Sequence, residues 1–151
     1  MVKPSLLFIA VLGFLGACDD DDEIVDIGGE GDVVVWTADI FGIAPYQYVG
    51  GNAEVSYEIG TFEFGATAEI FGDTPGAVRP WHVHFGTCAT GGDIVGVDSD
   101  YLPLVVDGAG ADVVSVIVPE PLDVNAAYHV NFHLAPDRQD VIIACGDLVL
   151  L

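Results

Sequence analysis

The chain has very few positive charges. Three Lys and Arg residues stand against 24 Asp and Glu, which gives a formal net charge of −21 at pH 7. The three cations are Lys3, Arg79 and Arg138. Because binding to nucleic-acid phosphates requires clustered Lys and Arg, this composition excludes a nucleic-acid-binding protein and a protein held to an anionic membrane by charge. The partners that it favours are cations, metals and neutral ligands.

The chain also lacks an apolar run long enough to span a bilayer. The longest run, Leu6 to Leu15, follows Lys3 and precedes small residues, and it is shorter than the roughly twenty residues that a membrane span needs. This order predicts an export signal. Its end, Leu15-Gly16-Ala17-Cys18, resembles the bacterial lipobox. We therefore expect residues 1–17 to be a lipoprotein signal peptide and Cys18 to carry the lipid that anchors the exported protein in the membrane. The alternative is an ordinary secretory signal with an incidental cysteine.

Residues 18–31 are acidic and rich in glycine, with an unbroken acidic run from Asp19 to Glu23. Such a segment is typical of a solvated tether between an anchor and a domain. Calcium binding is the other interpretation, but no loop with alternating acidic ligands and a glycine is present. We expect one folded domain over residues 32–151, since its length and the 52% apolar content of the chain suffice for a core.

Only three cysteines occur. If Cys18 carries lipid, Cys88 and Cys145 remain as a pair, in a compartment where disulfides persist.

From Asp32 onward no stretch keeps a helical apolar period, whereas alternation with period two is common. Turn residues such as Gly50-Gly51-Asn52 and Gly91-Gly92-Asp93 separate the alternating segments. The fold class predicted is all-β, an eight-stranded sandwich or Greek-key barrel. The expected strands lie near 32–41, 53–60, 62–71, 81–86, 102–106, 112–118, 126–134 and 140–150.

The four histidines lie in two of these strands. Side chains in a strand alternate between its faces, so the apolar residues of both segments should face the core and the histidines the outer wall. The residues expected in the core are Trp81, Val83, Phe85, Tyr128, Val130, Phe132 and Leu134. His82 and His84 can direct their imidazoles at one ion, and copper or zinc suits such ligands. His129 and His133 lie about 13 Å apart along a strand and should not share an ion unless a bulge intervenes. A Cys88–Cys145 bridge would bring the two histidine segments close together.

These segments resemble the copper/zinc superoxide dismutase family over roughly residues 53–148. The matching motifs are Trp81-His82-Val83-His84, Gly86-Thr87-Cys88, Leu102-Pro103-Leu104, His133-Leu134-Ala135-Pro136-Asp137 and Ala144-Cys145-Gly146. The resemblance implies an eight-stranded Greek-key barrel with copper on its outer wall. It also implies that His82, His84 and His133 are copper ligands and that Cys88 and Cys145 form the disulfide.

The chain departs from the family at its zinc site. No histidine occurs between His84 and His129, so the bridging and zinc-binding histidines have no counterparts and we expect copper without zinc. Ile142 stands where the enzymes have an arginine near the final cysteine; Arg138 is the candidate substitute in catalysis.

The sequence therefore predicts a lipid-anchored, superoxide dismutase-like protein that binds copper through three histidines. Superoxide is an anion, and a strongly negative protein repels it, so we expect weak or no dismutation. If the protein is an enzyme, it is a copper-dependent oxidoreductase. The alternative is a metal-free scaffold or interaction module resembling the related CHRD β-domains.

Overall fold

A computed structural model describes residues 31–151. The predicted signal peptide, the predicted lipidation site Cys18 and all of the predicted tether except residue 31 lie outside the described residues. Within residues 31–151, no helix is long and apolar enough to cross a membrane.

Strands make up the regular structure of residues 31–151, together with one short 3-10 turn, η1, at Asp98–Asp100. The strands are β1 (Val33–Gly42), β2 (Gly50–Glu58), β3 (Phe64–Phe71), β4 (Val78–Arg79), β5 (Trp81–Phe85), β6 (Leu104–Val105), β7 (Asp112–Val118), β8 (Tyr128–His133), β9 (Ile142–Asp147) and β10 (Val149–Leu150). The all-β class expected from the alternating pattern is therefore confirmed.

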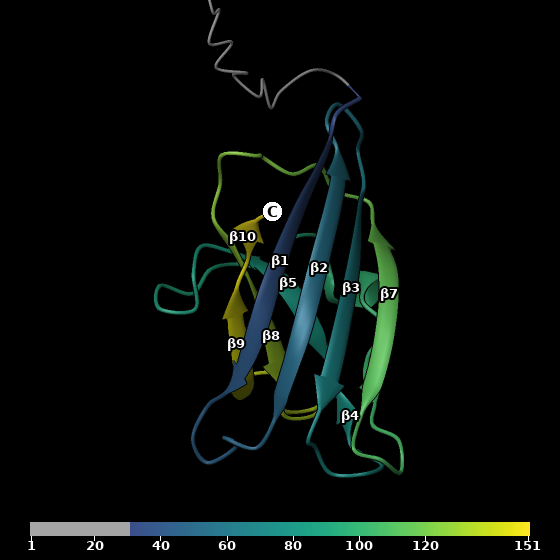
Figure 1. Cartoon of the computed structure of the whole chain (residues 1–151), viewed down its shortest axis with the longest axis vertical. Helices are drawn as coiled ribbons and strands as arrows, with labels where there is room; N and C mark the ends of the chain where they lie inside the picture. Colours follow the sequence, from purple (N-terminus) through teal and green to yellow (C-terminus); the bar gives the residue numbers. More distant parts are fainter. Residues whose placement is uncertain (1–30) are drawn as a thin grey trace, which may run out of the picture.

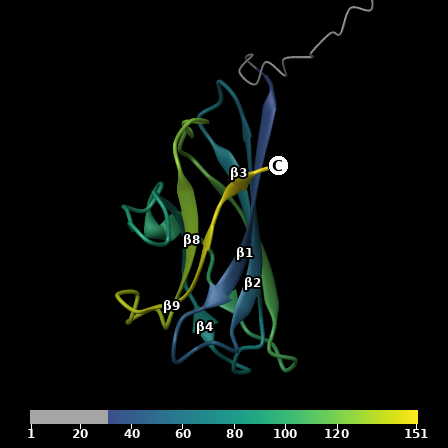
Figure 2. The same ribbon diagram turned by 60° about the vertical axis from the view of Figure 1, so that its left-hand side comes forward.

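One antiparallel sheet curls into a half-barrel (Figures 1 and 2). Its strand order is β5-β8-β9-β1-β2-β3-β7, while β10 also pairs with β1 and β4 pairs separately with β6. In Figure 2, β8 and β9 lie on one side of the molecule and β1, β2 and β3 on the other. The pairing of Phe41 with Cys145 joins these two walls, because it connects β1 to β9.

The core lies between the two walls and follows the alternation of the strands. In β2, for example, Ala53, Val55 and Tyr57 are buried, whereas Glu54 and Glu58 are exposed. Trp81, Val83, Val130 and Phe132 come from the histidine-bearing strands and are fully buried. Burial of each such large apolar side chain contributes about 1.5–3 kcal/mol relative to its exposure.

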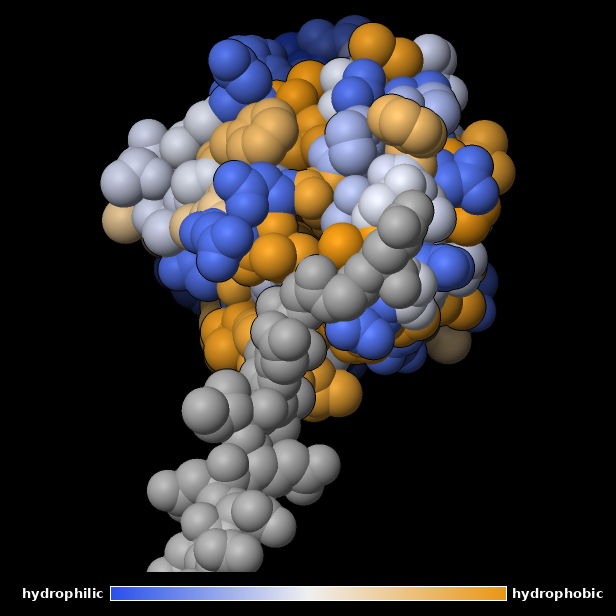
Figure 3. Space-filling view, turned by 90° about the horizontal axis from the view of Figure 1, so that it is seen from above, coloured by the Kyte–Doolittle hydropathy of each residue, from blue (hydrophilic) through white to orange (hydrophobic). Residues whose placement is uncertain are grey.

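Apolar residues also remain on the surface, as expected for a small domain. The most exposed include Phe41, Phe62 and Leu151. Figure 3, which views the molecule from above, shows apolar residues mixed with polar ones on this face.

Two local predictions were wrong. Gly50-Gly51-Asn52 was expected to be a turn but begins β2. A Cβ on Gly51 would lie 2.7 Å from Cε2 of Phe132, so glycine is needed here to let that buried ring approach the strand. Phe85 was expected in the core but is 44% exposed, because β5 ends at this residue; its ring lies beside that of Tyr128.

Candidate metal centre

The candidate metal centre lies on the outer face of the β5-β8-β9 wall. Two connecting segments pass over this face: residues 86–103, which include η1, and residues 134–141 (Figure 2). The histidines point away from the core, as the alternation predicts, but His82, His129 and His133 are buried and only His84 is partly exposed. The expectation that the histidines lie on the outer wall did not include their burial, because covering loops cannot be deduced from strand periodicity.

Strand register brings three of the histidines together. His82 lies opposite Asn131 in the β5-β8 pair, so His133 is its diagonal neighbour. A register irregularity between Phe132 and His133 in the β8-β9 pair accompanies this arrangement, and bulges of this kind re-aim side chains. One nitrogen from each of His82, His84 and His133 lies within 4.8 Å of the others, and this cluster can hold a metal ion.

In each of the three imidazoles, one ring nitrogen lies within hydrogen-bond distance of an oxygen on a connecting segment. Nε2 of His82 lies 2.8 Å from Oδ1 of Asp98. Nδ1 of His84 lies 3.1 Å from the carbonyl oxygen of Gly92, and Nδ1 of His133 lies 2.6 Å from that of Gln139.

These anchors determine the tautomers. Carbonyl and carboxylate oxygens only accept hydrogen bonds, so the ring nitrogen facing each of them carries the proton and donates it. The nitrogens left without a proton are Nδ1 of His82, Nε2 of His84 and Nε2 of His133, and those of His82 and His133 lie 3.1 Å apart. Such outer hydrogen bonds are the usual way in which proteins orient metal-binding histidines.

The electrostatic environment keeps the rings neutral. Burial is the main cause that lowers the pKa of His82 and of His84, and burial together with the neighbouring His82 lowers the pKa of His133 to about 4. At neutral pH the three rings therefore retain the lone pairs that a metal ion requires.

A pocket of about 340 Å³ opens onto the cluster and is lined by the three histidines together with Gly92, Asp93, Ile94, Asp98 and Gln139. Sequence reasoning missed the last five residues. Asp98 and Gln139 lie in connecting segments, where no period signals a contact, and only the turn residues Gly91-Gly92-Asp93 pointed to a loop at this place.

His129 is buried but does not belong to the ligand cluster. It lies directly opposite His84 in the β5-β8 pair, and the two rings stack with centroids 5.2 Å apart and planes inclined by 23°.

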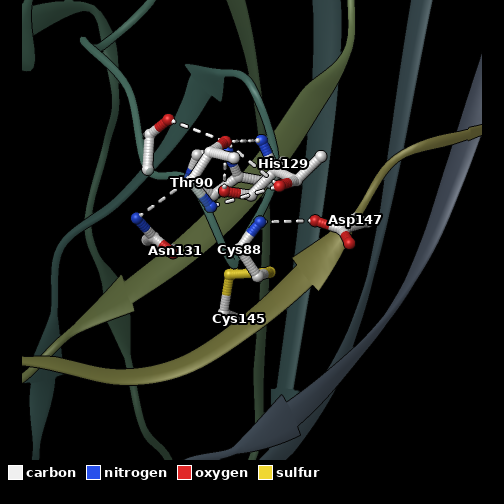
Figure 4. Close-up of a disulfide and its surroundings, with 8 residues drawn as sticks. Cys88, Thr90, His129, Asn131, Cys145 and Asp147 are labelled. Atoms are coloured by element: carbon white, nitrogen blue, oxygen red, sulfur yellow. Dashed lines mark hydrogen bonds between the residues drawn. A yellow bond between two sulfur atoms is a disulfide. The ribbon is translucent and has the colours of Figure 1, made fainter.

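The predicted disulfide between Cys88 and Cys145 is present. Figure 4 shows it beside β9, close to the side chains of His129 and Asn131 on β8. The backbone N–H of Cys88 also donates to Oδ1 of Asp147, at 2.6 Å. Two contacts thus attach the segment after β5 to β9, and the same segment supplies the Gly92 carbonyl that anchors His84.

Neither arginine lines the pocket. Arg138 lies in the 134–141 segment with its side chain 55% exposed, and its Nε is 3.4 Å from Oδ1 of Asp140. Its catalytic role stays a prediction. Arg79 is buried, pairs with Asp73 and donates to the carbonyl of Leu134.

No family model and no curated protein matches this chain.

Proposed function

We propose that this protein is an exported, lipid-anchored relative of the copper/zinc superoxide dismutases that binds copper through His82, His84 and His133, with weak or no superoxide dismutation. The observation that carries the proposal is the orientation of the three rings. Each ring donates one N–H to a fixed oxygen, which leaves its second nitrogen free to bind a metal, and one nitrogen of each ring lies within 4.8 Å of the others.

Two details favour a cation at the point of convergence. Nδ1 of His82 and Nε2 of His133 lie 3.1 Å apart, and the anchors leave both without a proton, so their lone pairs repel each other unless a cation lies between them. Nε2 of His84 is buried and has no hydrogen-bond partner within residues 31–151. A buried polar atom without a partner costs about 1–3 kcal/mol, and coordination of a metal ion would remove that cost.

The donor set favours copper over zinc. Three nitrogen ligands bind copper more tightly than zinc in the general order of divalent metals, and Cu(I) accepts two or three imidazoles. Structural zinc sites have four protein ligands, and no fourth histidine or cysteine joins this cluster among residues 31–151, so the cluster does not match a structural zinc site. When bound, copper would supply one-electron redox chemistry.

The surroundings do not favour an anionic substrate. Asp93 and Asp98 line the pocket, and the only arginines of the chain lie outside it. Superoxide dismutases raise the arrival rate of superoxide with a positive field, which these residues do not provide. The chain's own residues are arranged to hold a cation.

The test is elemental analysis of residues 19–151 after loading with copper and zinc and removal of free metal. We expect close to one copper and no zinc per chain, and no copper in the variant in which all three histidines are changed to Ala. Circular dichroism of that variant shows whether the sheet is retained.

Absence of bound metal in the wild type would favour the alternative, a metal-free CHRD-like scaffold or interaction module at the cell envelope. The observation on its side is that the apolar core and the disulfide involve none of the three histidines.

The proposed lipid anchor has its own test. Cys18→Ser removes the thiol that would be acylated, so we expect the full chain to move from the membrane fraction to the soluble fraction, measured by fractionation and blotting. A variant that stays in the membrane fraction would contradict acylation at Cys18.

A further inference from the structure

His129 is a buried polar residue that the ligand set does not use. Its exposed fraction is 1%, and it projects from β8 on the same face as Asn131 and His133. Its Nδ1 has no hydrogen-bond partner among the described residues. Leu or Phe at this position would fill the same space without the cost of a buried polar atom that has no partner. Packing alone therefore does not explain why a histidine stands here.

The contact with His84 supplies that explanation. The two residues are opposed in the β5-β8 pair, and their rings lie nearly parallel at 5.2 Å. His84 is the least buried of the cluster histidines, and in the part of the chain that the structure describes the Gly92 carbonyl is its only hydrogen-bond partner. The flat face of His129 therefore packs against one side of the partly exposed imidazole of His84.

His129 is itself held in place. The Nδ2 group of Asn131 donates to Nε2 of His129 at 3.3 Å, and Figure 4 shows both side chains beside the disulfide-bonded segment. A ring fixed in this way is a firm surface against which His84 can pack.

The same geometry argues against His129 as a ligand. A ligand nitrogen points along the plane of its ring, so an ion bound to Nε2 of His84 lies in the plane of His84. The ring of His129 is stacked beside that plane, and its nitrogens are not part of the cluster.

We propose that His129 is a positioning residue. Through ring stacking it holds the plane of His84 so that Nδ1–H meets the Gly92 carbonyl and Nε2 points into the cluster. This inference rests on the proposed function, because it assigns a role in metal binding.

The experiment compares His129→Ala and His129→Phe with the wild type by competition for copper against a chelator of known affinity. Loss of an outer-shell partner weakens metal binding about 10- to 100-fold, and we expect this loss for the Ala variant. The Phe variant keeps a flat ring and should bind within about threefold of the wild type. Val130→Ala, a core change on the same strand, is the matched control, with lower thermal stability and unchanged affinity.

A second readout needs no metal. Nitrogen-15 spectra of the metal-free imidazoles report the tautomer of each histidine. We expect His84 to be the Nδ1–H form in the wild type and in His129→Phe, and a mixture of tautomers in His129→Ala.

Two results overturn the inference: wild-type copper affinity in His129→Ala, or an unchanged His84 tautomer in that variant. A wild type that binds no copper overturns the proposed function. The two failures are distinguishable, because the tautomer spectra are recorded without metal and still report whether His129 orients His84.

Discussion

Asp73 is the only buried carboxylate among residues 31–151. Its oxygens lie 2.6 Å from Nε and 2.9 Å from Nη2 of Arg79, and it also accepts the backbone N–H of Thr74. Arg79 in turn donates to the carbonyl of Leu134, the residue after His133. The Asp73–Arg79 pair therefore connects the turn after β3 to the end of β8, the strand that carries the proposed ligand His133.

We expect Asp73→Asn to lower the free energy of unfolding by about 3–5 kcal/mol, because it leaves a buried guanidinium without its counter-ion. Chemical denaturation at pH 7 measures this loss. Asp140→Asn is the control, because the Arg138–Asp140 pair is exposed and such pairs contribute about 1 kcal/mol or less. Equal losses in the two variants would contradict the role given to Asp73.

The pH dependence of the same pair has a defined sign. Burial by itself raises the pKa of Asp73, but the hydrogen bonds from Arg79 and Thr74 outweigh it and hold the pKa below the ordinary value of 3.8. The pair therefore contributes fully above that pH and loses its contribution as the pH falls through the lowered pKa. We expect the stability difference between wild type and Asp73→Asn to shrink in this acid range, as measured by denaturation at a series of pH values.

The proposed ligands should act as one unit. Changing His82, His84 or His133 singly to Ala should weaken copper binding by a similar large factor, well above the loss in His129→Ala, because each supplies one of three converging nitrogens. Chelator competition measures all four variants. A loss in His129→Ala equal to that of the ligand variants would show that the β5-β8 register is wrong.

At the scale of elements, the segment between β5 and η1 shapes the site. A Cβ on Gly92 would overlap the backbone carbonyl of Phe85, so only glycine lets this segment approach the end of β5. The approach sets the distance from the Gly92 carbonyl to His84.

We therefore expect Gly92→Ala to displace the segment and weaken copper binding about tenfold or more, the usual effect of losing an outer hydrogen bond. Gly108→Ala is the control, since no atom of the described residues lies within 4 Å of a Cβ there, and it should bind copper like the wild type. Unchanged affinity in Gly92→Ala would show that the carbonyl does not orient His84.

Periodicity predicted much of this arrangement. Strand β7 lies at the expected residues 112–118, and alternation correctly placed Trp81 and Val83 on the face opposite the histidines. Alternation states which face a side chain takes but not which residues lie opposite each other, so the diagonal approach of His133 to His82 could not be derived. The short strand β4 and the contact of Asp98 with His82 have no periodic signal at all.

At the scale of the whole molecule, charge governs which small ions approach. The net charge of −21 is accompanied by Asp93 and Asp98 at the pocket itself. Both the long-range field and the local one therefore attract cations and repel anions.

This field leads to an unusual salt dependence. Any superoxide turnover by the copper-loaded protein should become faster as ionic strength rises from about 0.01 M to about 0.15 M. Over this range the Debye length shortens from about 30 Å to about 8 Å, so the added salt screens the repulsion between the protein and superoxide. Stopped-flow decay of superoxide measures the rate constant. Asp93→Asn should flatten the dependence, and a rate that falls with added salt would contradict the charge argument.

The pairing of β1 with β9 and β10 has a consequence for the order of events during biosynthesis. Phe41 meets Cys145, and Trp36 meets Leu150, more than a hundred residues later. The two walls can therefore join only after residues 145–150 have been synthesised. Folds dominated by such distant pairings form slowly, and the three histidines come together only after His133 has left the ribosome. Capture of the proposed metal ion would thus be a late step, which must wait for β8 as well as β5.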